Sequence, residues 1–407
     1  MDIKIIPNIL SGKVSVPPSK SVAHRMIIAA ALTDGTSTIS NIFTSVDITA
    51  TMDCMKALGA KISFSGDTAV IEGIRSVPDK AVLNCHESGS TLRFLIPVGC
   101  ALGVNAKFIG SGKLPQRPLT TLLNELPKHG ASFVLPNNGE NLPLIVNGKL
   151  TGGRFYVDGN VSSQFITGLL FALPLLDGDS EIVLTSPLQS KPYVDITIGV
   201  LRDFDCEINE TESGYFVKGN QRFKPFSGAV EGDFSQAAFF YTANTLGSSI
   251  EICGLNENSL QGDKRITEIC KCVAVNGSAF ELDCSDIPDL VPILSVLGCF
   301  CKGKSRITNA ARLRIKECDR LAAMEDCLNK IGGKVKSLPD GLEIDGVGSL
   351  KGGEVECFND HRIAMSMAIA ATRCENPLIL RGAECVSKSF PNFFEVYKSL
   401  GGIFEEI

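Results

Sequence analysis

The chain has 407 residues, of which 44% are hydrophobic and 21% charged, and its formal net charge is −6 at pH 7. This length and balance are typical of a globular protein with two or three domains, each large enough to bury a core. A negative chain without Trp and with five Tyr offers little for phosphate attraction or base stacking, so we expect no nucleic-acid partner. No run approaches the roughly twenty apolar residues of a membrane span, and the first ten residues lack the apolar core of a signal peptide. We therefore expect a cytoplasmic protein with no membrane partner.

The fifteen cysteines are scattered and odd in number. There is no C-x-x-C pair, and the C-x-C pairs Cys270/Cys272 and Cys299/Cys301 have no histidine at ligand spacing. A zinc site or a disulfide framework is therefore not expected. Free thiols in a reducing cytosol are the better interpretation, and we expect no metal site.

The predicted elements repeat along the chain. At five places a turn containing Gly or Lys leads into a short β-type stretch, then a small or capping residue, then an apolar helix. These segments are 10–25, 79–94, 150–165, 226–240 and 350–365, and a sixth, 284–300, shares the cap and the helix. The small or capping residues are Ser21, Ser90, Ser163, Ser235, Asp289 and Asp360. Their spacing of roughly seventy residues predicts a repeated supersecondary unit.

Each repeat continues alike, with a second β-type stretch, a polar segment, a second helix and a hairpin-like tail. This order predicts an α/β protein of six β-α-β-α-β-β repeats, three in each of two domains. The final copy lacks its last strand, which residues 1 to about 18 can supply. We therefore expect one domain of residues 1–18 plus 228–407 and another of residues 19–227, with hinge crossings near 17–19 and 224–230.

Basic residues recur at equivalent places in the repeats. Helix starts and the polar segments after the second strands carry Lys20, Arg25, Arg93, Arg117, Lys191, Lys264, Arg265, Arg312, Arg314, Lys316, Arg320, His361, Arg362 and Lys388. Helix N-termini add backbone N–H donors, and Arg offers two-point contacts to carboxylate or phosphate. Since so many cations repel one another, the pattern predicts a multiply charged ligand or two anionic ligands.

Two acidic residues stand among these cations, Asp289 and Glu317. A carboxylate in cationic surroundings stays ionised and can accept a proton from a positioned hydroxyl, while a second can relay a proton elsewhere. Two plainer roles remain open: Asp289 as a helix cap and Glu317 as an i,i+3 partner of Arg320. The segment "FIGSGKLPQRP" fails as a P-loop because Leu114 replaces the metal-binding hydroxyl, so neither ATP nor a metal ion is implied.

Nine motifs in order resemble those of the 5-enolpyruvylshikimate-3-phosphate (EPSP) synthases, in the enolpyruvyl transferase family. They are "PPSKSVAHR", "ESGSTLR", "LPQRPL", "VSSQFITGLL", "SKPYVDIT", "EGDFSQAAFF", "RIKECDRL", "NDHRIAM" and "SKSFPNFF", from residue 17 to residue 394. The resemblance implies two inside-out α/β domains that close over the substrates. It implies transfer of the enolpyruvyl group of phosphoenolpyruvate to the 5-hydroxyl of shikimate 3-phosphate, in the shikimate pathway to chorismate and aromatic amino acids. It implies no cofactor.

The resemblance also assigns residues. Asp289 matches the base for the 5-hydroxyl, Glu317 the proton donor to the methylene carbon, and Lys20 a group between the substrates. The residues matching the shikimate 3-phosphate site are Lys20, Ser21, Arg25, Ser162, Ser163, Gln164, Ser190, Tyr193, Asp289 and Lys316. Those matching the phosphoenolpyruvate site are Lys20, Gly89, Arg117, Gln164, Arg320, His361, Arg362 and Lys388. The small Gly89 would leave room for the inhibitor glyphosate. His24 has no assigned role and is interpreted as structural.

The chain departs from the family pattern at Glu87, Arg312 and Leu313, where members often have Asn, Asn and Trp, so Glu87 and Arg312 are not assigned as ligands. Two alternatives remain. The UDP-N-acetylglucosamine enolpyruvyl transferases share the repeat, but they need a reactive loop cysteine that "IGSGKLPQRPL" lacks. A non-catalytic phosphate- or RNA-binding module is the other, and the acidic balance and the Asp289/Glu317 pair count against it. We expect a monomeric enzyme of bacterial or archaeal type.

Overall fold

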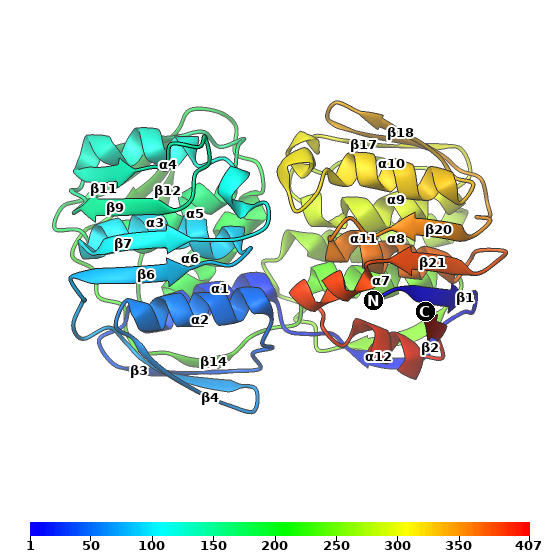
Figure 1. Ribbon diagram of the computed structural model, residues 1–407, viewed down its shortest axis with the longest axis horizontal. Helices are drawn as coiled ribbons and strands as arrows, with labels where there is room; N and C mark the ends of the chain where they lie inside the picture. The colour runs from blue at the N-terminus through cyan, green and yellow to red at the C-terminus, as the bar shows by residue number, and fades with distance from the viewer. The chain divides into compact units, whose positions relative to one another are not determined.

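The computed structural model describes all 407 residues. They form two compact units: unit 1 comprises Met1–Pro17 and Gly232–Ile407, and unit 2 comprises Pro18–Glu231 (Figure 1). The chain therefore passes between the units twice. These units are defined by their contacts. That the domains expected from the sequence fold independently stays a prediction.

Two repeats of unit 2 have the complete pattern. One consists of β6 (Lys80–Asn84), α3 (Gly89–Leu102), β7 (Asn105–Ile109), α4 (Thr120–Glu125), β8 (Ala131–Val134) and β9 (Leu144–Gly148). The other consists of β10 (Arg154–Val157), α5 (Ser163–Ala172), β11 (Ser180–Leu184), α6 (Lys191–Asp203), β12 (Ile208–Thr211) and β13 (Gly214–Val217). Their sheets have the same order, β6-β7-β9-β8 and β10-β11-β13-β12. In each, the first two strands are parallel and the hairpin adds antiparallel strands.

The first repeat of unit 2 takes its first strand from a distant part of the chain. It contains α1 (Lys20–Ala31), β3 (Thr36–Ser40), α2 (Val46–Ala57), β4 (Lys61–Ser65) and β5 (Thr68–Glu72). The strand parallel to β3 is β14 (Ser227–Ala229), which precedes the helix α7 of unit 1 in the sequence.

The strand that precedes α1 in the sequence, β2 (Ser11–Ser15), pairs in parallel with β15 (Ser249–Cys253) in unit 1. The first strands of the first and fourth repeats are therefore exchanged. The sequence grouped residues up to about 18 with the last repeat, and for β2 this is corrected. Both stretches have the same local β pattern, so only the hydrogen-bonding partner distinguishes their places.

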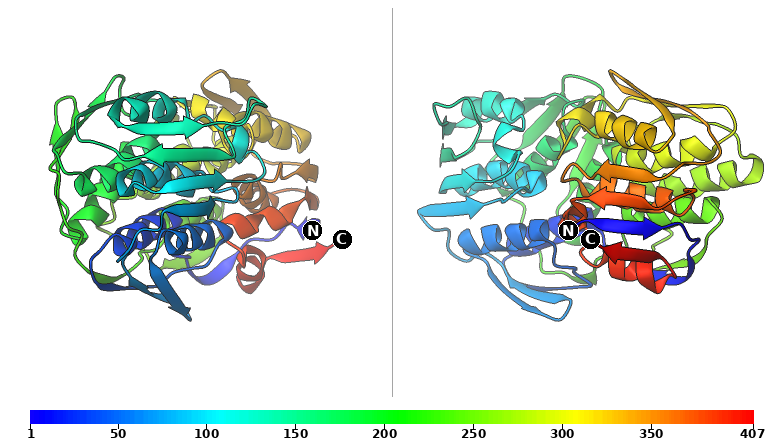
Figure 2. Two further views of the ribbon diagram at one scale, coloured as in Figure 1. Left: turned by 60° about the vertical axis from the view of Figure 1, so that its left-hand side comes forward. Right: turned by 45° about the vertical axis from the view of Figure 1, so that its right-hand side comes forward.

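In unit 1 the fourth repeat is short, because α7 (Phe234–Thr245), β15 and α8 (Ile266–Asn276) lead directly into the fifth. The fifth consists of β16 (Glu281–Asp283), α9 (Val291–Phe300), β17 (Lys304–Thr308), α10 (Arg320–Lys330), β18 (Lys334–Leu338) and β19 (Gly341–Asp345). The sixth consists of β20 (Gly353–Glu356), α11 (His361–Ala371), β21 (Leu378–Arg381), α12 (Phe393–Ser399) and β22 (Ile403–Glu406). Its last place is taken by β1 (Ile3–Ile6), between β21 and β22 (Figure 2).

The helices form the core of each unit and the sheets surround them. Every residue of α11 is buried, and α3 is buried over nearly its whole length. The strands β6 and β7 alternate exposed and buried residues, as expected for sheets with one face on the core and one in water. This is the inside-out α/β architecture that the sequence resemblance implied.

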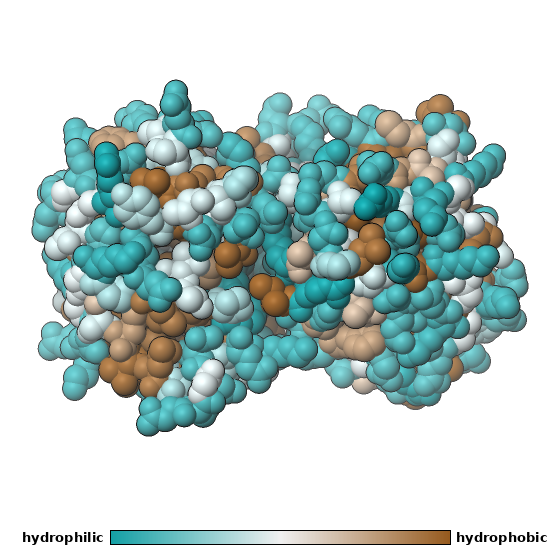
Figure 3. Space-filling view, turned by 90° about the horizontal axis from the view of Figure 1, so that it is seen from above, coloured by the Kyte–Doolittle hydropathy of each residue, from teal (hydrophilic) through white to brown (hydrophobic).

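The surface seen in Figure 3 is mostly hydrophilic, with hydrophobic residues in small separate patches. None of the helices combines the length and the hydrophobicity that crossing a bilayer requires. The fifteen cysteines are free thiols, and all except Cys253 and Cys272 are buried.

Candidate active site

A buried arginine organises the charged cluster of unit 1. Arg320 is the first residue of α10 and is 2% exposed. Its Nε donates to Asp360 Oδ2 at 2.8 Å, its Nη2 to Glu317 Oε2 at 2.8 Å, and its Nη1 to Asp289 Oδ1 at 3.1 Å. Three segments that are far apart in the sequence thus place a carboxylate against one guanidinium group. Burial opposes the charge, but Asp360, Glu317 and Asp289 raise the pKa of Arg320 well above its usual value.

Asp289 is held by a second arginine. Arg362, in the first turn of α11, donates from Nη2 to Asp289 Oδ2 at 2.7 Å and from Nη1 to the Asp289 backbone oxygen at 3.3 Å. Burial raises the pKa of Asp289, but Arg362, Arg320 and Lys316 outweigh it and hold the pKa well below its usual range. The carboxylate is therefore ionised and surrounded by cations.

The sequence left two structural roles open for these acids: a helix cap for Asp289 and an ion pair with Arg320 for Glu317. Asp289 lies in a 3-10 turn (Pro288–Leu290), and the residue that caps α9 is Leu290, so the helix-cap role is not the one observed. Glu317 does form the i,i+3 ion pair with Arg320, at 2.8 Å. That pair places the Glu317 carboxylate beside the same guanidinium that binds Asp289.

Asp360 connects this cluster to the start of α11. It is completely buried and caps α11, accepting the backbone N–H of Arg362 at 2.9 Å. It also lies 3.5 Å from the Cys318 thiol. Burial raises the pKa of Asp360, but Arg320 lowers it below its usual value. One carboxylate thus sets the start of α11 and the orientation of Arg320 together.

The remaining predicted residues of unit 1 lie on neighbouring turns. Lys316 directly follows the turn η6 (Ala311–Ile315), and its charge contributes to the low pKa of Asp289. His361 is buried in the first turn of α11. Lys388 ends the turn η7 (Ala383–Lys388) and donates to the backbone oxygen of Asn359 at 3.0 Å, next to the α11 cap.

In unit 2, α1 presents Lys20 and Arg25. Its cap is Ser19, whose hydroxyl accepts the N–H of Val22, so the sequence placed the cap two residues late at Ser21. Lys20 Nζ lies 2.8 Å from Asp47 Oδ2, an ion pair between α1 and α2.

Arg25 is buried and held on several sides. Its guanidinium donates to Thr197 Oγ1 at 2.8 Å, the Ser21 backbone oxygen at 2.7 Å, the Tyr193 backbone oxygen at 2.9 Å and Thr167 Oγ1 at 3.4 Å. These contacts use four of the five N–H donors of an arginine. Burial lowers the pKa of Arg25 to about 9, so the group stays charged at neutral pH.

Gln164 connects two helices of unit 2. Its Oε1 accepts from Arg93 Nη1 at 2.7 Å, and its Nε2 donates to Ser90 Oγ at 2.9 Å. Ser162 caps α5 and accepts the N–H of Gln164 at 3.3 Å, and Ser163 begins that helix. The network joins the starts of α3 and α5. The first backbone N–H groups of a helix have no partner within the helix, so these two starts are suited to bind an anion.

Gly89 and Arg117 are close neighbours. A Cβ added at Gly89 would lie 2.8 Å from Arg117 Nη1 and 2.9 Å from its Cζ. Gly89 begins α3, and Ser88 caps that helix by accepting the N–H of Thr91 at 3.2 Å. At the start of α6, Ser190 has a positive φ of 58° and Tyr193 turns its backbone oxygen toward Arg25.

A sequence profile described as EPSP synthase (3-phosphoshikimate 1-carboxyvinyltransferase) matches residues 5–397. The chain belongs to the EPSP synthase family. The 3-phosphoshikimate 1-carboxyvinyltransferase of Clostridium novyi is 46% identical over 430 residues, covering 100% of this chain and 98% of that protein. The protein of the same name from Clostridium acetobutylicum is 48% identical over 417 residues, covering 98% and 97%.

Solved structures agree on the fold. The EPSP synthase of Acinetobacter baumannii superimposes with a TM-score of 0.83 at 23% identity, over the full length of both chains. Inside this EPSP synthase fold, the predicted residues fall into two sets. Unit 2 carries Lys20, Ser21, Arg25, Gly89, Arg117, Ser162, Ser163, Gln164, Ser190 and Tyr193. Unit 1 carries Asp289, Lys316, Glu317, Arg320, His361, Arg362 and Lys388.

Three residues with direct contacts to these sets received no site role from the sequence. Asp360 was identified only as a cap, Arg93 only as one of many cations, and Asp47 was not singled out. The cap position was a signal for Asp360, because it precedes the pair His361 and Arg362. Asp47 offered none, since a lone acid in a helix is usually solvated.

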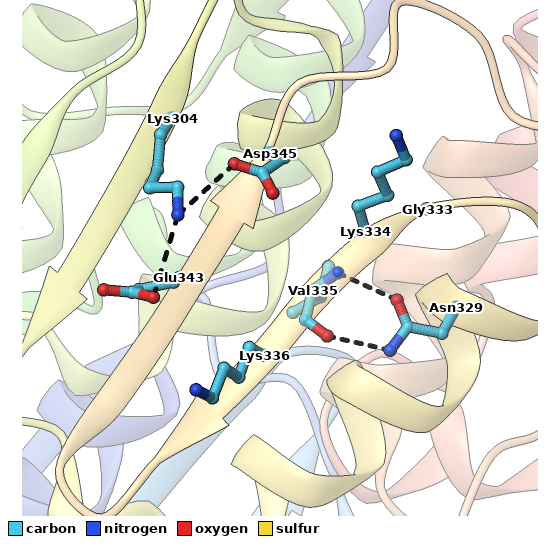
Figure 4. Close-up of a pocket in the computed structure, with 8 residues that line it drawn as sticks. All are labelled: Lys304, Asn329, Gly333, Lys334, Val335, Lys336, Glu343 and Asp345. Atoms are coloured by element: carbon cyan, nitrogen blue, oxygen red, sulfur yellow. Dashed lines mark hydrogen bonds and ion pairs between the residues drawn. The ribbon is translucent and has the colours of Figure 1, made fainter.

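Unit 1 of this EPSP synthase fold also has a pocket. It has a volume of about 370 Å³ and is lined by Lys304, Asn329, Gly333, Lys334, Val335, Lys336, Glu343 and Asp345 (Figure 4). Lys304 lies 4.0 Å from Glu343 and 3.7 Å from Asp345, so its charge is already balanced there. None of the predicted site residues lines it.

Proposed function

We propose that the chain transfers the enolpyruvyl group of phosphoenolpyruvate to the 5-hydroxyl of shikimate 3-phosphate and releases phosphate. The observation that carries this function is the cluster of Asp289, Glu317, Arg320 and Arg362 in a chain of the EPSP synthase family. Two acids among arginines can move protons while the arginines hold an anionic donor.

In unit 1 we assign the donor to Arg320, Arg362, His361 and Lys388. The planar guanidinium groups suit the donor's carboxylate, and the compact ammonium of Lys388 suits its phosphate. Asp289 is the base for the acceptor hydroxyl, with Lys316 beside that hydroxyl, and Glu317 is the proton donor to the methylene carbon. The contacts of Asp289 and Glu317 with one guanidinium support their action on one donor.

In unit 2 we assign shikimate 3-phosphate to the starts of α1, α5 and α6. The residues are Lys20, Ser21, Arg25, Ser162, Ser163, Gln164, Ser190 and Tyr193. Helix N-termini and serine hydroxyls donate hydrogen bonds to phosphate, which supports this assignment. Gly89 and Arg117, together with Lys20 and Gln164, are assigned to the donor.

The reaction follows as an addition and an elimination. Asp289 takes the proton of the 5-hydroxyl while the hydroxyl oxygen bonds to C2 of the donor. Glu317, in its protonated form, donates its proton to C3, which becomes a methyl group. The tetrahedral intermediate then returns a proton from that methyl group to the Glu317 carboxylate while its C2–O bond to phosphate breaks, and the proton held by Asp289 leaves with the phosphate. Fixed cations stabilise the charge that develops on the leaving phosphate without reorganising. No cofactor takes part in these steps.

We further propose that the enzyme acts as a cytoplasmic monomer without a nucleic-acid or membrane partner. The net charge of −6 supports the lack of a nucleic-acid partner, because phosphate backbones attract basic proteins. The fifteen free cysteines fit a reducing compartment.

One assay separates this function from its alternatives. Phosphate release from phosphoenolpyruvate is measured with shikimate 3-phosphate or with UDP-N-acetylglucosamine as acceptor. Release with shikimate 3-phosphate alone is expected. Release with the nucleotide sugar alone would assign the chain to the other enolpyruvyl transferases, and release with neither would leave only a binding module.

A further inference from the structure

The two arginines assigned to the donor's carboxylate already bind carboxylates of the protein. Arg320 donates to Asp360 from Nε at 2.8 Å and from Nη2 at 3.4 Å, to Glu317 from Nη2, and to Asp289 from Nη1. These contacts use four of its five N–H donors. An incoming carboxylate can therefore gain a two-point contact only by replacing one that is present.

The three carboxylates on Arg320 differ in exposure. The Asp360 side chain is completely buried and also caps α11, so it is a permanent partner. The side chains of Asp289 and Glu317 are 20% and 23% exposed. Water can solvate these two when they leave the guanidinium, which lowers the cost of releasing them.

Asp289 bridges both arginines with separate oxygens. Its Oδ1 accepts from Arg320 at 3.1 Å and its Oδ2 accepts from Arg362 at 2.7 Å. A carboxylate between two guanidinium groups is the arrangement expected for a bound carboxylic acid substrate. Ser235 Oγ, 3.1 Å from Arg362 Nη2, holds that arginine in place from another side.

From these contacts, and on the basis of the proposed function, we propose that Asp289 and Glu317 are exchangeable counter-ions of Arg320 and Arg362. They hold the two guanidinium groups in place until the carboxylate of the donor substrate replaces them. Asp360 and Ser235 remain and keep the arginines oriented during the exchange.

The exchange links donor binding to the strength of the base. While the arginines bind Asp289, they hold its pKa well below the usual range, and such a carboxylate accepts a proton poorly. The donor's carboxylate takes up the arginines and adds a nearby negative charge, and both changes favour the protonated form of Asp289. The base thus becomes stronger when the donor is present.

Binding to the full chain tests the exchange, with phosphoenolpyruvate and, for the carboxylate alone, pyruvate as probes in calorimetry. Asp289→Asn removes a competing charge and keeps the side-chain size, so we expect the Kd of both probes to fall about tenfold, which corresponds to about 1.4 kcal/mol. Glu317→Gln should lower it by a smaller factor. Asp340→Asn, an exposed site in the same unit, should leave it within about twofold of the parent.

Weaker or unchanged binding in both variants would overturn the exchange, since a fixed structural ion pair would lose its hold on the arginines when one partner is removed. Urea unfolding checks that the variants are folded, and Glu317→Gln decides if Asp289→Asn is not. Turnover of the parent chain with both substrates is measured separately. Tighter pyruvate binding by the variants without any turnover by the parent would support the exchange and refute the proposed function. Turnover by the parent with weaker pyruvate binding by the variants would support the proposed function and refute the exchange.

Discussion

Asp360 accepts the Nε–H of Arg320 at 2.8 Å. The Asp360 side chain is completely buried and the Arg320 side chain is 2% exposed. Removing one partner of such a pair leaves an uncompensated charge out of water. We predict that Asp360→Asn lowers the free energy of unfolding by about 3–5 kcal/mol. Urea unfolding measures this, and the KM for phosphoenolpyruvate should rise because Arg320 loses its orientation.

Asp345→Asn is the matched control for that change. Its carboxylate lies 3.7 Å from Lys304 with both side chains half exposed, and such surface pairs contribute less than about 1 kcal/mol. An equal fall in the free energy of unfolding of the two variants would contradict the larger contribution expected of the buried pair.

Glu317→Gln tests the proton donor. General acid catalysis contributes about 10²–10⁴-fold, and the turnover number should fall within that range. With the parent enzyme in D2O, deuterium should enter the vinyl methylene of the product, because C3 passes through a methyl group. Mass spectrometry of the product measures the label. Glu325→Gln, on α10, serves as the control, and full activity of the Glu317 variant would contradict the role.

Gly89→Ala tests the neighbourhood of Arg117. The added methyl group would lie 2.8 Å from Arg117 Nη1, so the guanidinium must shift. Overpacking of this kind costs about 1–3 kcal/mol, which predicts a KM for phosphoenolpyruvate raised about tenfold and weaker inhibition by glyphosate. Gly99→Ala, in the same helix, has its nearest contact at 3.8 Å and should behave as the parent. Equal glyphosate inhibition of the Gly89 variant and the parent would contradict the assignment.

His24 gives a prediction for stability against pH. Burial lowers its pKa to about 3, with Lys20 and Arg25 also lowering it and Asp47 opposing them. The unfolded chain has the ordinary pKa near 6.5 and binds the proton more readily. His24 therefore contributes stability that is complete above about pH 6.5 and is lost as the pH falls toward 3, by up to about 1.4 kcal/mol per pH unit.

Urea unfolding at pH 7.5 and pH 5 measures this loss. His24→Gln should flatten the pH dependence between these values, and His86→Gln, at an exposed position, should not. An unchanged slope in the His24 variant would assign the acid sensitivity to other groups.

The sequence predicted the repeat and the charged residues because both are local patterns. Apolar helices after small or capping residues mark α3, α5 and α11. Arg362, at a helix start, and Arg320, in a polar segment after a strand, are predicted as anion ligands because cations recur at those places. The acids Asp289 and Glu317 could be singled out because they are rare among those cations. Their shared contact with one guanidinium required the structure.

Other features depend on long-range pairing that a local pattern does not determine. β2 and β14 have equivalent patterns, and their exchange is decided by hydrogen bonds to β15 and β3. The role of Asp360 depends on its approach to Arg320, forty residues earlier in the chain. The sequence left Asp360 without a site role because its local pattern shows only the helix cap.

In the proposed reaction the enolpyruvyl group moves with cleavage of the C2–O bond of phosphoenolpyruvate. The direct measurement uses donor labelled with ¹⁸O in the bridging oxygen, incubated with the enzyme and shikimate 3-phosphate. We predict that the released phosphate carries the label and that its amount equals the enolpyruvyl product. Unlabelled phosphate with the label in pyruvate would mean cleavage of the P–O bond and would contradict the proposed reaction.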